Sequence, residues 1–383
     1  MCELHMRRTN RIVPTYTGDV SGACSALFEL GGMVVIHDPS GCNSTYNTHD
    51  ETRWYDHDSL IFITGLVERD AILGNDEKLI HDVVEAAGQL SPRFIALCNS
   101  PIPFISGTDF HAICKLIERQ TGTPCFYVRT NGMHDYVVGA GNAFVQVAER
   151  FVVPAKVRPG TCNILGATPL DLGIAGSDEP LRVFAQRAGF DVISCWAMGS
   201  TLDELARAAQ AQVNLVVSAT GFAVAQHLRE RYGTPYVVGF PVGEFADRLA
   251  QAMGEAARLN ECQWPIRDLR VAAGEDNAYC VGEPVQMASL AACLQLDGVC
   301  SPSVLCPLEA SQELLAPADQ LVEGEEGVEE ALARARLVLA DGLYAPIIPT
   351  GARHIRLPHQ ALSGRNGWKT ARDLCELDLG ATL

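Results

Sequence analysis

Three cysteines, Cys24, Cys42 and Cys98, stand at places in the sequence from which a metal cluster can be held. Cys42 follows four apolar residues of strand character and a polar loop with proline and glycine, and Cys98 ends a similar apolar run. The functional crevice of an open α/β sheet lies at the carboxyl ends of its strands, so these two thiols can converge. Cys24 lies upstream, at the expected start of a helix that precedes the strand before Cys42. Three thiolates from separate segments suit an iron–sulfur cluster better than a disulfide.

Length and composition indicate how large the hydrophobic core can be and in which cellular compartment the protein is expected. The 383 residues, 48% of them hydrophobic, can bury a large core, and the length suggests two or three domains. The sequence has no apolar run of about 18 residues that would span a membrane, and no apolar segment typical of a secretory signal. We therefore expect a cytoplasmic protein whose 14 cysteines are metal ligands and ordinary buried residues, not a disulfide framework.

The net charge is −17 at pH 7, and the basic residues form no continuous stripe. Nucleic acids and anionic membranes attract basic surfaces, so we expect neither as a partner. The acidity says nothing about the chemistry itself.

Short apolar strands, polar loops and helices alternate along the chain. In the first part we expect strands at 34–36, 93–97 and 124–128 and helices at 76–89, 110–120 and 140–151. In the second part the expected strands are 161–166, 191–195, 215–218 and 236–238, and the helices 179–188, 202–209 and 223–232. The third part has expected strands at 278–282 and 335–341 and a helix at 285–296. This alternation is typical of parallel sheets covered by helices on both faces.

We therefore predict an α/β fold of three Rossmann-like units. A proline-containing linker at 153–160 separates the first unit from the second. The expected boundaries are 1–155 for a cluster-binding unit, 156–265 for the second, 266–353 for the third and 354–383 for a tail that packs back on the first.

Several motifs, taken in order, resemble the subunits of nitrogenase component 1. The first unit has Gly41-Cys42 after a strand, the helix start ILGNDEKL at 72–79, and Cys98 followed by Gly-Thr-Asp at 107–109. Later matches are WAMGSTLDEL at 196–205, NLV at 214–216, YGTP at 232–235 and GEP at 282–284. Their order and spacing extend the resemblance over nearly the whole chain, although the chain is shorter than a nitrogenase subunit.

The resemblance implies three cysteine ligands to an iron–sulfur cluster at the interface between two subunits. Cys42 and Cys98 match the second and third ligands of the family, and backbone amides at Gly41 and Cys42 are available to donate hydrogen bonds to sulfur. Cys24 is then the remaining ligand, although it lies 18 residues before Cys42, closer than is usual in the family. We expect a [4Fe–4S] cluster or a larger one of the P-cluster type. A smaller cluster shared across a dimer is the alternative if Cys24 is not a ligand.

The resemblance also bears on the reaction. In the nitrogenase subunit that carries the active site, the metal cluster is held by a cysteine after the Asn-Leu-Val strand, whereas Ser218 stands there in this sequence. A neutral hydroxyl is a poor ligand for soft iron–sulfur species. Dinitrogen reduction is therefore not expected, and the chain looks more like the nitrogenase-like reductases that act on an organic substrate such as a tetrapyrrole.

Partners follow from the same resemblance. An iron–sulfur ATPase would deliver electrons to the cluster, and this sequence has no G-x-x-x-x-G-K-[ST] motif with which to hydrolyse ATP itself. We expect an oxidoreductase that reduces a small molecule as a homodimer or as a heteromer with a sibling subunit. Two other hypotheses stay open: a non-catalytic scaffold for metallocofactor assembly, and a metal-free Rossmann protein that binds a sugar or nucleotide.

Polar residues near the expected strand ends are candidate proton donors. His134 and Asp135 follow the third strand, and His49 lies in the polar string 49–53 after Cys42. Histidine titrates near neutral pH and can supply the protons that accompany electrons. The alternatives are a satisfied loop histidine at 134 and, for the string, a solvated face or a set of interface salt bridges.

Overall fold

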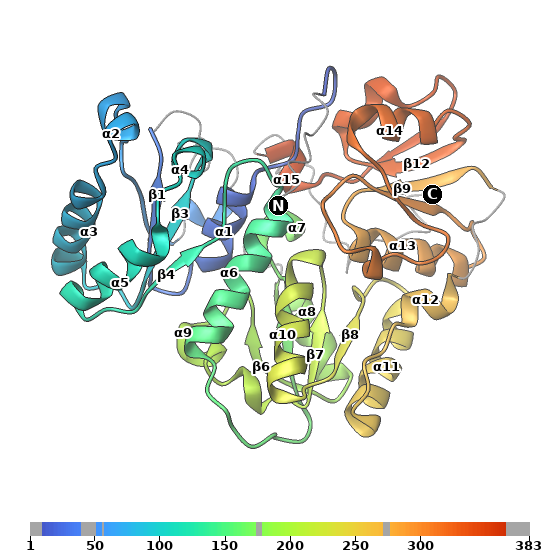
Figure 1. Ribbon diagram of the computed structural model, residues 1–383. Coiled ribbons are helices and arrows are strands. Elements are labelled where there is room, and N and C mark those ends of the chain that lie inside the picture. Colours follow the sequence, from blue (N-terminus) through green and yellow to red (C-terminus); the bar gives the residue numbers. More distant parts are fainter. Residues whose placement is uncertain (1–9, 40–50, 56, 174–177, 271–275, 365–383) are drawn as a thin grey trace.

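Three parallel β-sheets, one in each third of the chain, organise the computed structural model (Figure 1). The structure describes residues 10–39, 51–55, 57–173, 178–270 and 276–364. Figure 1 shows the three sheets arranged around a central region formed by α1 (Asp19–Leu27), α6 (Tyr136–Phe151), α7 (Pro169–Leu172) and α15 (Gln360–Ser363). Every pairing between neighbouring strands of these sheets is parallel.

The first sheet has the strand order β2-β1-β3-β4. Its strands are β1 (Met33–His37), β2 (Leu60–Ile63), β3 (Ile95–Asn99) and β4 (Cys125–Val128). Its helices are α2 (Glu68–Leu73), α3 (Asp76–Leu90), α4 (Pro101–Ser106) and α5 (Phe110–Thr121), and a 3-10 turn lies at Thr52–Tyr55. β1 and β3 are buried along their whole length, as expected for central strands covered on both faces.

The second sheet has the order β6-β5-β7-β8. Its strands are β5 (Thr161–Leu165), β6 (Asp191–Cys195), β7 (Val213–Val216) and β8 (Tyr236–Val238). Its helices are α8 (Asp178–Arg187), α9 (Leu202–Leu205), α10 (Phe222–Tyr232), α11 (Phe245–Leu259) and α12 (Pro265–Leu269), with 3-10 turns at Ala208–Gln210 and Ala219–Gly221.

The third sheet has the order β11-β10-β9-β12-β13. Its strands are β9 (Ala278–Val281), β10 (Ser303–Cys306), β11 (Gln320–Leu321), β12 (Leu337–Ala340) and β13 (Arg353–Arg356). Its helices are α13 (Pro284–Leu296) and α14 (Gly324–Ala331), with 3-10 turns at Gln312–Leu314 and Gly342–Ile347. Residues 284–294 of α13 are all buried, so this helix is enclosed by the protein on every side.

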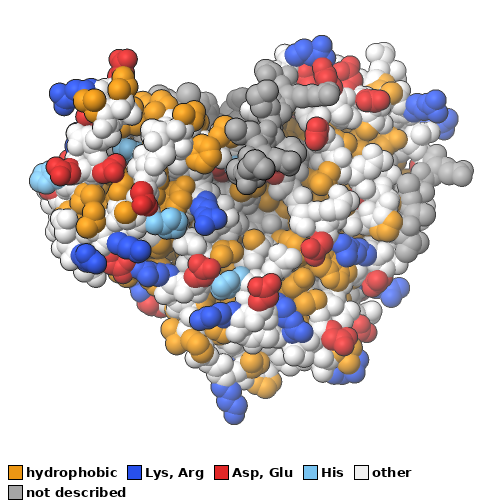
Figure 2. All heavy atoms as spheres, in the orientation of Figure 1, with side chains coloured by type: hydrophobic (Ala, Val, Ile, Leu, Met, Phe, Trp, Pro, Cys, Tyr) orange, Lys and Arg blue, Asp and Glu red, His pale blue; other side chains and the backbone are white. Residues whose placement is uncertain are grey.

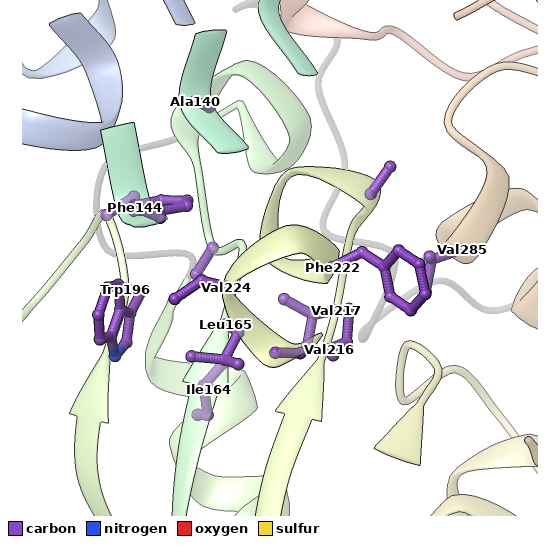
Figure 3. Close-up of a cluster of buried hydrophobic side chains, with 14 of the residues drawn as sticks. Ala140, Phe144, Ile164, Leu165, Trp196, Val216, Val217, Phe222, Val224 and Val285 are labelled. Carbon is purple, nitrogen blue, oxygen red and sulfur yellow. The ribbon is translucent and has the colours of Figure 1, made fainter. Parts of the chain in front are cut away.

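One large apolar core runs from the first unit through α6 into the second and third. Figure 3 shows Phe144 of α6 beside Trp196, with Leu165 and Val216 of the second sheet below and Val285 of α13 farther along. The rings of Phe144 and Trp196 meet edge to face, with centroids 5.7 Å apart. The units are therefore joined by a shared interior.

The three helix-flanked sheets confirm the predicted α/β fold of three Rossmann-like units. Several bounds differ from the sequence prediction, such as those of β7, predicted at 215–218 and found at Val213–Val216, and of α9, predicted at 202–209 and found at Leu202–Leu205. β3 extends through Cys98 to Asn99, because these residues pair with Ile36 and His37 of β1. α6 begins at Tyr136 instead of at residue 140.

The strands β2, β10 and β11 and the helix α11 were not among the predicted elements. Residue 354, where the tail was expected to begin, lies inside β13. Beyond β13, α15 packs against α7, and the carbonyl of Ala361 accepts a hydrogen bond from the amide of Thr17. Within the described ranges, no helix has the length and apolar character needed to cross a bilayer.

Candidate functional site

Cys24 and Cys98 lie in the same interior of the first unit. Cys24 is on α1 and Cys98 is in β3, and both side chains are fully buried in the core that α1, α6 and the first sheet share. Burial raises the pKa of both thiols, and the charge of an ionised Cys98 raises that of Cys24 further. Burial therefore keeps both thiols protonated at neutral pH.

Cys42, Gly41 and His49 lie outside the described residues. Cys98 pairs across the sheet with Ile36, near the end of β1, and Cys42 follows six residues after Ile36 in the sequence. Two of the three expected thiols therefore share one interior beside the strand that leads to the third. Thiols are the donors that iron–sulfur clusters take, so the residues present fit such a group. The described residues alone contain no set of three His, Cys, Asp or Glu side chains able to hold a metal ion.

Arg53 forms salt bridges, one of the alternatives expected for the string 49–53, but it is buried and pairs with Glu29 and Glu51 of this same chain. Its side chain is 1% exposed, and its Nε donates to Oε1 of Glu51 over 2.7 Å. Nη1 donates to Glu29 over 2.9 Å and to the carbonyl of Ala197 over 2.7 Å, and Nη2 donates to the carbonyl of Ser25 over 2.7 Å. For the part of the string 49–53 that the structure describes, the expected solvated face is wrong. Arg53 anchors the turn at Thr52–Tyr55 to α1 and to the second unit.

Asp135 is the N-cap of α6 and also ties the first unit to the third. Its Oδ1 accepts a hydrogen bond from the amide of Val137 over 3.1 Å, and its Oδ2 accepts one from the amide of Glu309 over 2.6 Å. His134 is about half exposed, with Nδ1 2.8 Å from Oε2 of Glu309. These contacts give both residues a structural role, and proton donation by either stays a prediction.

Asp19 is a buried carboxyl beside the cysteine interior. It is fully enclosed at the start of α1 and accepts hydrogen bonds from the amides of Asn131 and Gly132 over 2.7 and 2.8 Å. Burial raises the pKa of Asp19 to about 6, although these two amides act in the opposite direction. The charge of Asp19 in turn adds to the elevation of the pKa of Cys98.

Ser218 is held in a hydrogen-bonded turn. Its hydroxyl donates to the carbonyl of Gly166 over 2.8 Å and lies 2.7 Å from Oγ1 of Thr220. The turn is tight, since a Cβ on Gly221 would lie 2.4 Å from the carbonyl oxygen of Leu165. The side chain that replaces the expected cysteine is therefore fully buried and satisfied within the protein.

Where the three units meet, Tyr136, Asp171, Glu283 and His359 form a group that we call the seam cluster. Tyr136 donates its hydroxyl proton to Oδ1 of Asp171 over 2.5 Å. Nε2 of His359 lies 3.2 Å from the hydroxyl oxygen of Tyr136 and 3.6 Å from Oδ1 of Asp171. Four separate segments thus bring titratable groups together.

Glu283 caps α13 within this cluster. Its two carboxyl oxygens accept hydrogen bonds from the amides of Ala219 and Gln286, each over 2.7 Å. Burial raises the pKa of Glu283 to about 8, and the nearby charge of Asp171 contributes to the increase. From the sequence alone, Glu283 is considered only as part of the GEP motif at 282–284, and His359 is not singled out. Each is a polar residue next to apolar segments, which is the one signal in the sequence that could have found them.

An exposed apolar surface lies at the outer end of the first unit. It consists of Val67, Ile72, Leu73, Ile102, Phe104 and Ile105 on and beside α2 and α4, and is called here the α2–α4 patch. Figure 2 shows apolar side chains gathered at the end of the molecule where Figure 1 places these helices. A polar cavity of about 510 Å³ adjoins the patch and includes His37, at the end of β1, in its lining. A contiguous exposed apolar surface of this kind is typical of a protein-binding site.

Residues 19–283 match the family model described as nitrogenase component 1 type oxidoreductase. The chain belongs to this family. The resemblance expected from the sequence motifs is thereby confirmed. The matched range contains Cys24, Cys42, Cys98 and Ser218 and ends at Glu283.

Curated relatives differ in what they do. The chain is 26% identical to the nitrogenase iron-molybdenum cofactor biosynthesis protein NifE of Klebsiella pneumoniae, over 93% of this chain and 88% of the relative. It is 26% identical to the nitrogenase molybdenum-iron protein alpha chain of Azospirillum brasilense, over 53% of this chain and 45% of the relative. It is 23% identical to one subunit of the light-independent protochlorophyllide reductase of a Synechococcus species, over 58% of this chain and 47% of the relative. The chain thus spans about half the length of the last two.

Solved structures agree on the fold. The structure titled "Nitrogenase Cp1 at pH 6.5" superposes with a TM-score of 0.65 over 93% of this chain and 88% of that chain, at 15% sequence identity. At this identity the likeness concerns the fold alone.

Proposed function

We propose that this chain is the iron–sulfur-containing, substrate-reducing component of a two-component, ATP-dependent reductase. One observation carries the proposal: Cys24 and Cys98 share one interior beside the strand that leads to Cys42. The family membership supports the same conclusion. The proposed setting is the cytoplasm, where thiols stay reduced.

Cys24, Cys42 and Cys98 are the proposed ligands, with the amide of Gly41 donating to sulfur. When bound, an iron–sulfur cluster of the [4Fe–4S] or larger type supplies low-potential electrons. Metal binding requires thiolates, so loading displaces the protons that burial holds on Cys24 and Cys98. The three ligands come from one chain, and the proposal completes the site with a second copy or a sibling subunit.

The proposed electron donor is an iron–sulfur ATPase that docks near the α2–α4 patch. Ile72, Leu73 and Ile105 in this patch are 73%, 75% and 78% exposed, which is unusual for such large apolar side chains. The patch lies on α4, which directly follows β3, the strand of Cys98, and on α2, which follows β2. A partner bound there would be near the cluster.

The proposed substrate is a small organic molecule and not dinitrogen. Ser218 offers a buried hydroxyl that is already hydrogen bonded to Gly166, where a metal-holding subunit has a thiol. The side chain at this place is therefore a poor anchor for a soft metal cluster. We also propose His49, His134 and Asp135 as proton donors, because each follows a strand of the first sheet in the sequence.

A second candidate function is a scaffold for metallocofactor assembly. The NifE relative favours it, because that comparison covers 93% of this chain and 88% of the relative. Both functions need the cluster, and they differ in what is released. A reductase alters a small molecule, whereas a scaffold transfers a metal cluster to another protein.

Anaerobic purification tests the proposal. We expect bound iron and sulfide and an EPR signal upon reduction, followed by ATP-dependent reduction of a small molecule when an iron–sulfur ATPase is added. Protein without iron after anaerobic purification and anaerobic reconstitution would reject both functions. Iron-loaded protein that passes its cluster to an apo-acceptor, without turnover of a substrate, would establish the scaffold.

A further inference from the structure

In the seam cluster, hydrogen bonds join His359, Tyr136 and Asp171, and Gln286 connects Asp171 with Glu283: its amide donates to Glu283 over 2.7 Å and its Nε2 to the carbonyl of Asp171 over 3.5 Å. Tyr136 starts α6, Asp171 lies in α7, Glu283 caps α13 and His359 precedes α15. In Figure 1 the start of α6, α7 and α15 lie together in the centre of the molecule. The side chain of His359 is 10% exposed and that of Asp171 is 0% exposed, so His359 is the end of the chain nearer to solvent.

The donors and acceptors define a direction for proton movement. The hydroxyl of Tyr136 donates to Oδ1 of Asp171, and its oxygen is left to accept from Nε2 of His359 at 3.2 Å. Oδ2 of Asp171 accepts from the hydroxyl of Thr168 over 2.7 Å. Both carboxyl oxygens of Asp171 thus have hydrogen-bond donors inside the protein.

At the inner end of this hydrogen-bonded series, the carboxyl groups of Asp171 and Glu283 form a pair. Two buried carboxyls whose charges interact do not both ionise readily, so one proton is retained between them. Burial and the charge of Asp171 raise the pKa of Glu283 to about 8. Further titratable groups that face the cluster from neighbouring elements are Tyr16, Asp135, Cys306, Asp341 and Tyr344.

We propose that the seam cluster is a proton relay in which His359 takes up protons and the Asp171–Glu283 pair stores them. In the relay step the Nε2–H bond of the His359 imidazolium breaks and a bond forms to the oxygen of Tyr136. At the same time Tyr136 passes its own hydroxyl proton to Oδ1 of Asp171. Tyr136 is unchanged, His359 becomes neutral, Asp171 becomes protonated, and no electrons move.

The relay rests on the proposed function for its purpose, because reduction of an organic substrate consumes one proton for each electron added to form a new bond to hydrogen. Electrons from a cluster must therefore be matched by protons from the protein. The seam cluster is a supply of protons inside the molecule, with one end closer to solvent than the other.

A purely structural reading is that the same bonds only hold the units together. The two readings differ in what happens to the stored proton. If the bonds only hold the units together, mutation should lower the stability and nothing more. The relay also predicts a protonated carboxyl whose titration depends on Asp171.

Infrared spectroscopy of the full-length protein tests this directly. We expect the carbonyl band of a protonated carboxyl at pH 7, lost with a midpoint near pH 8 and absent in Glu283→Gln. Asp171→Asn removes the neighbouring charge and should move this midpoint to lower pH by about one unit or more. Asp178→Asn is the matched control, because Asp178 is also buried but pairs with Arg182 over 2.9 Å outside the cluster. No such band at pH 7, or a midpoint that Asp171→Asn leaves unchanged, overturns the relay.

The rate of product formation is a second test, and it can be read even if a variant is slightly less stable than wild type. Tyr136→Phe removes only the hydroxyl that links His359 to Asp171. We expect it to slow product formation about tenfold or more while cluster reduction by the donor is unchanged. Product formation within twofold of wild type would overturn the relay.

The infrared test needs neither cluster nor partner, so the two proposals fail separately. Wild-type protein that binds no iron rejects the proposed function, whatever the infrared result. Wild-type protein that reduces a substrate but lacks the titrating band rejects the relay alone.

Discussion

The carbonyl oxygen of Tyr136 occupies the space in which a side chain on Gly22 would begin. A Cβ added at Gly22 would lie 2.2 Å from this oxygen, and one added at Gly139 would lie 1.8 Å from the carbonyl oxygen of Asp19. Helices α1 and α6 therefore touch backbone to backbone. This contact places Cys24 on α1 and Tyr136 on α6 relative to each other, and so links the proposed cluster site to the seam cluster.

Gly22→Ala is expected to separate α1 from α6 and to lower the free energy of unfolding by about 2–3 kcal/mol. Gly88→Ala is the control, because Gly88 lies in α3 with no atom near its would-be Cβ and alanine favours a helix. Urea unfolding of the two variants gives the comparison. Equal stability of Gly22→Ala and wild type would contradict the close packing.

Arg53→Met is expected to lower the free energy of unfolding by about 3–5 kcal/mol, because it removes the guanidinium that pairs with the buried carboxylate of Glu51. Lys78→Ala breaks an exposed ion pair with Asp82 and should cost less than about 1 kcal/mol. Thermal unfolding measures both. A small loss in Arg53→Met would mean that the ion pair does not anchor the turn at Thr52–Tyr55.

Asp19 is expected to make stability depend on pH between 3.8 and about 6. Its pKa is higher in the folded than in the unfolded protein, so the folded protein binds more protons in this window and the free energy of unfolding falls as the pH rises. Above about pH 6 the full penalty of about 3 kcal/mol is present. Asp19→Asn should remove this part of the pH dependence, measured by urea unfolding between about pH 4 and pH 7. An unchanged slope would show that Asp19 titrates normally.

Ser218→Ala is expected to lower the free energy of unfolding by about 1–2 kcal/mol, because the hydroxyl that satisfies the carbonyl of Gly166 is lost. Iron content after anaerobic purification should not change. A loss of iron in this variant, with the fold intact by circular dichroism, would identify Ser218 as part of a metal site and contradict its structural role.

Leu73→Asp and Ile105→Asp are expected to weaken electron transfer from the ATPase about tenfold or more, with iron content and stability unchanged. Leu259→Asp is the control, because Leu259 is 45% exposed on α11, outside the α2–α4 patch. Stopped-flow oxidation of the reduced ATPase measures the effect. If Leu259→Asp weakens transfer as much as the patch variants do, the docking proposal fails.

Local sequence patterns predicted most of the central elements. Helix α3 was predicted at 76–89 and is found at Asp76–Leu90, because Leu79, Ile80, Val83 and Ala87 recur on one face and Asn75 caps the start. The buried strands were predictable as short apolar runs between loops. Edge strands such as β11, which is only two residues long and exposed, carry no such pattern.

The candidate site was only partly predictable, because its contacts join distant segments. The run before Cys98 reads the same whether the cysteine ends the strand or begins the loop, and pairing with β1 decides for the strand. The burial of Arg53 and the proximity of Asp171 to Glu283 depend on how the units pack against one another. Polar residues in a sequence do not show whether water or another side chain will satisfy them.

Iron analysis of cysteine variants tests the central claim most directly. Cys24→Ser, Cys42→Ser and Cys98→Ser, purified anaerobically beside wild type, are expected to lose most of the bound iron and the EPR signal. Cys195→Ser is the matched control, since Cys195 is as buried as Cys24 and Cys98 but lies in β6 of the second unit, and it should retain both. Full iron in all three variants would contradict the proposal that these thiols hold a cluster.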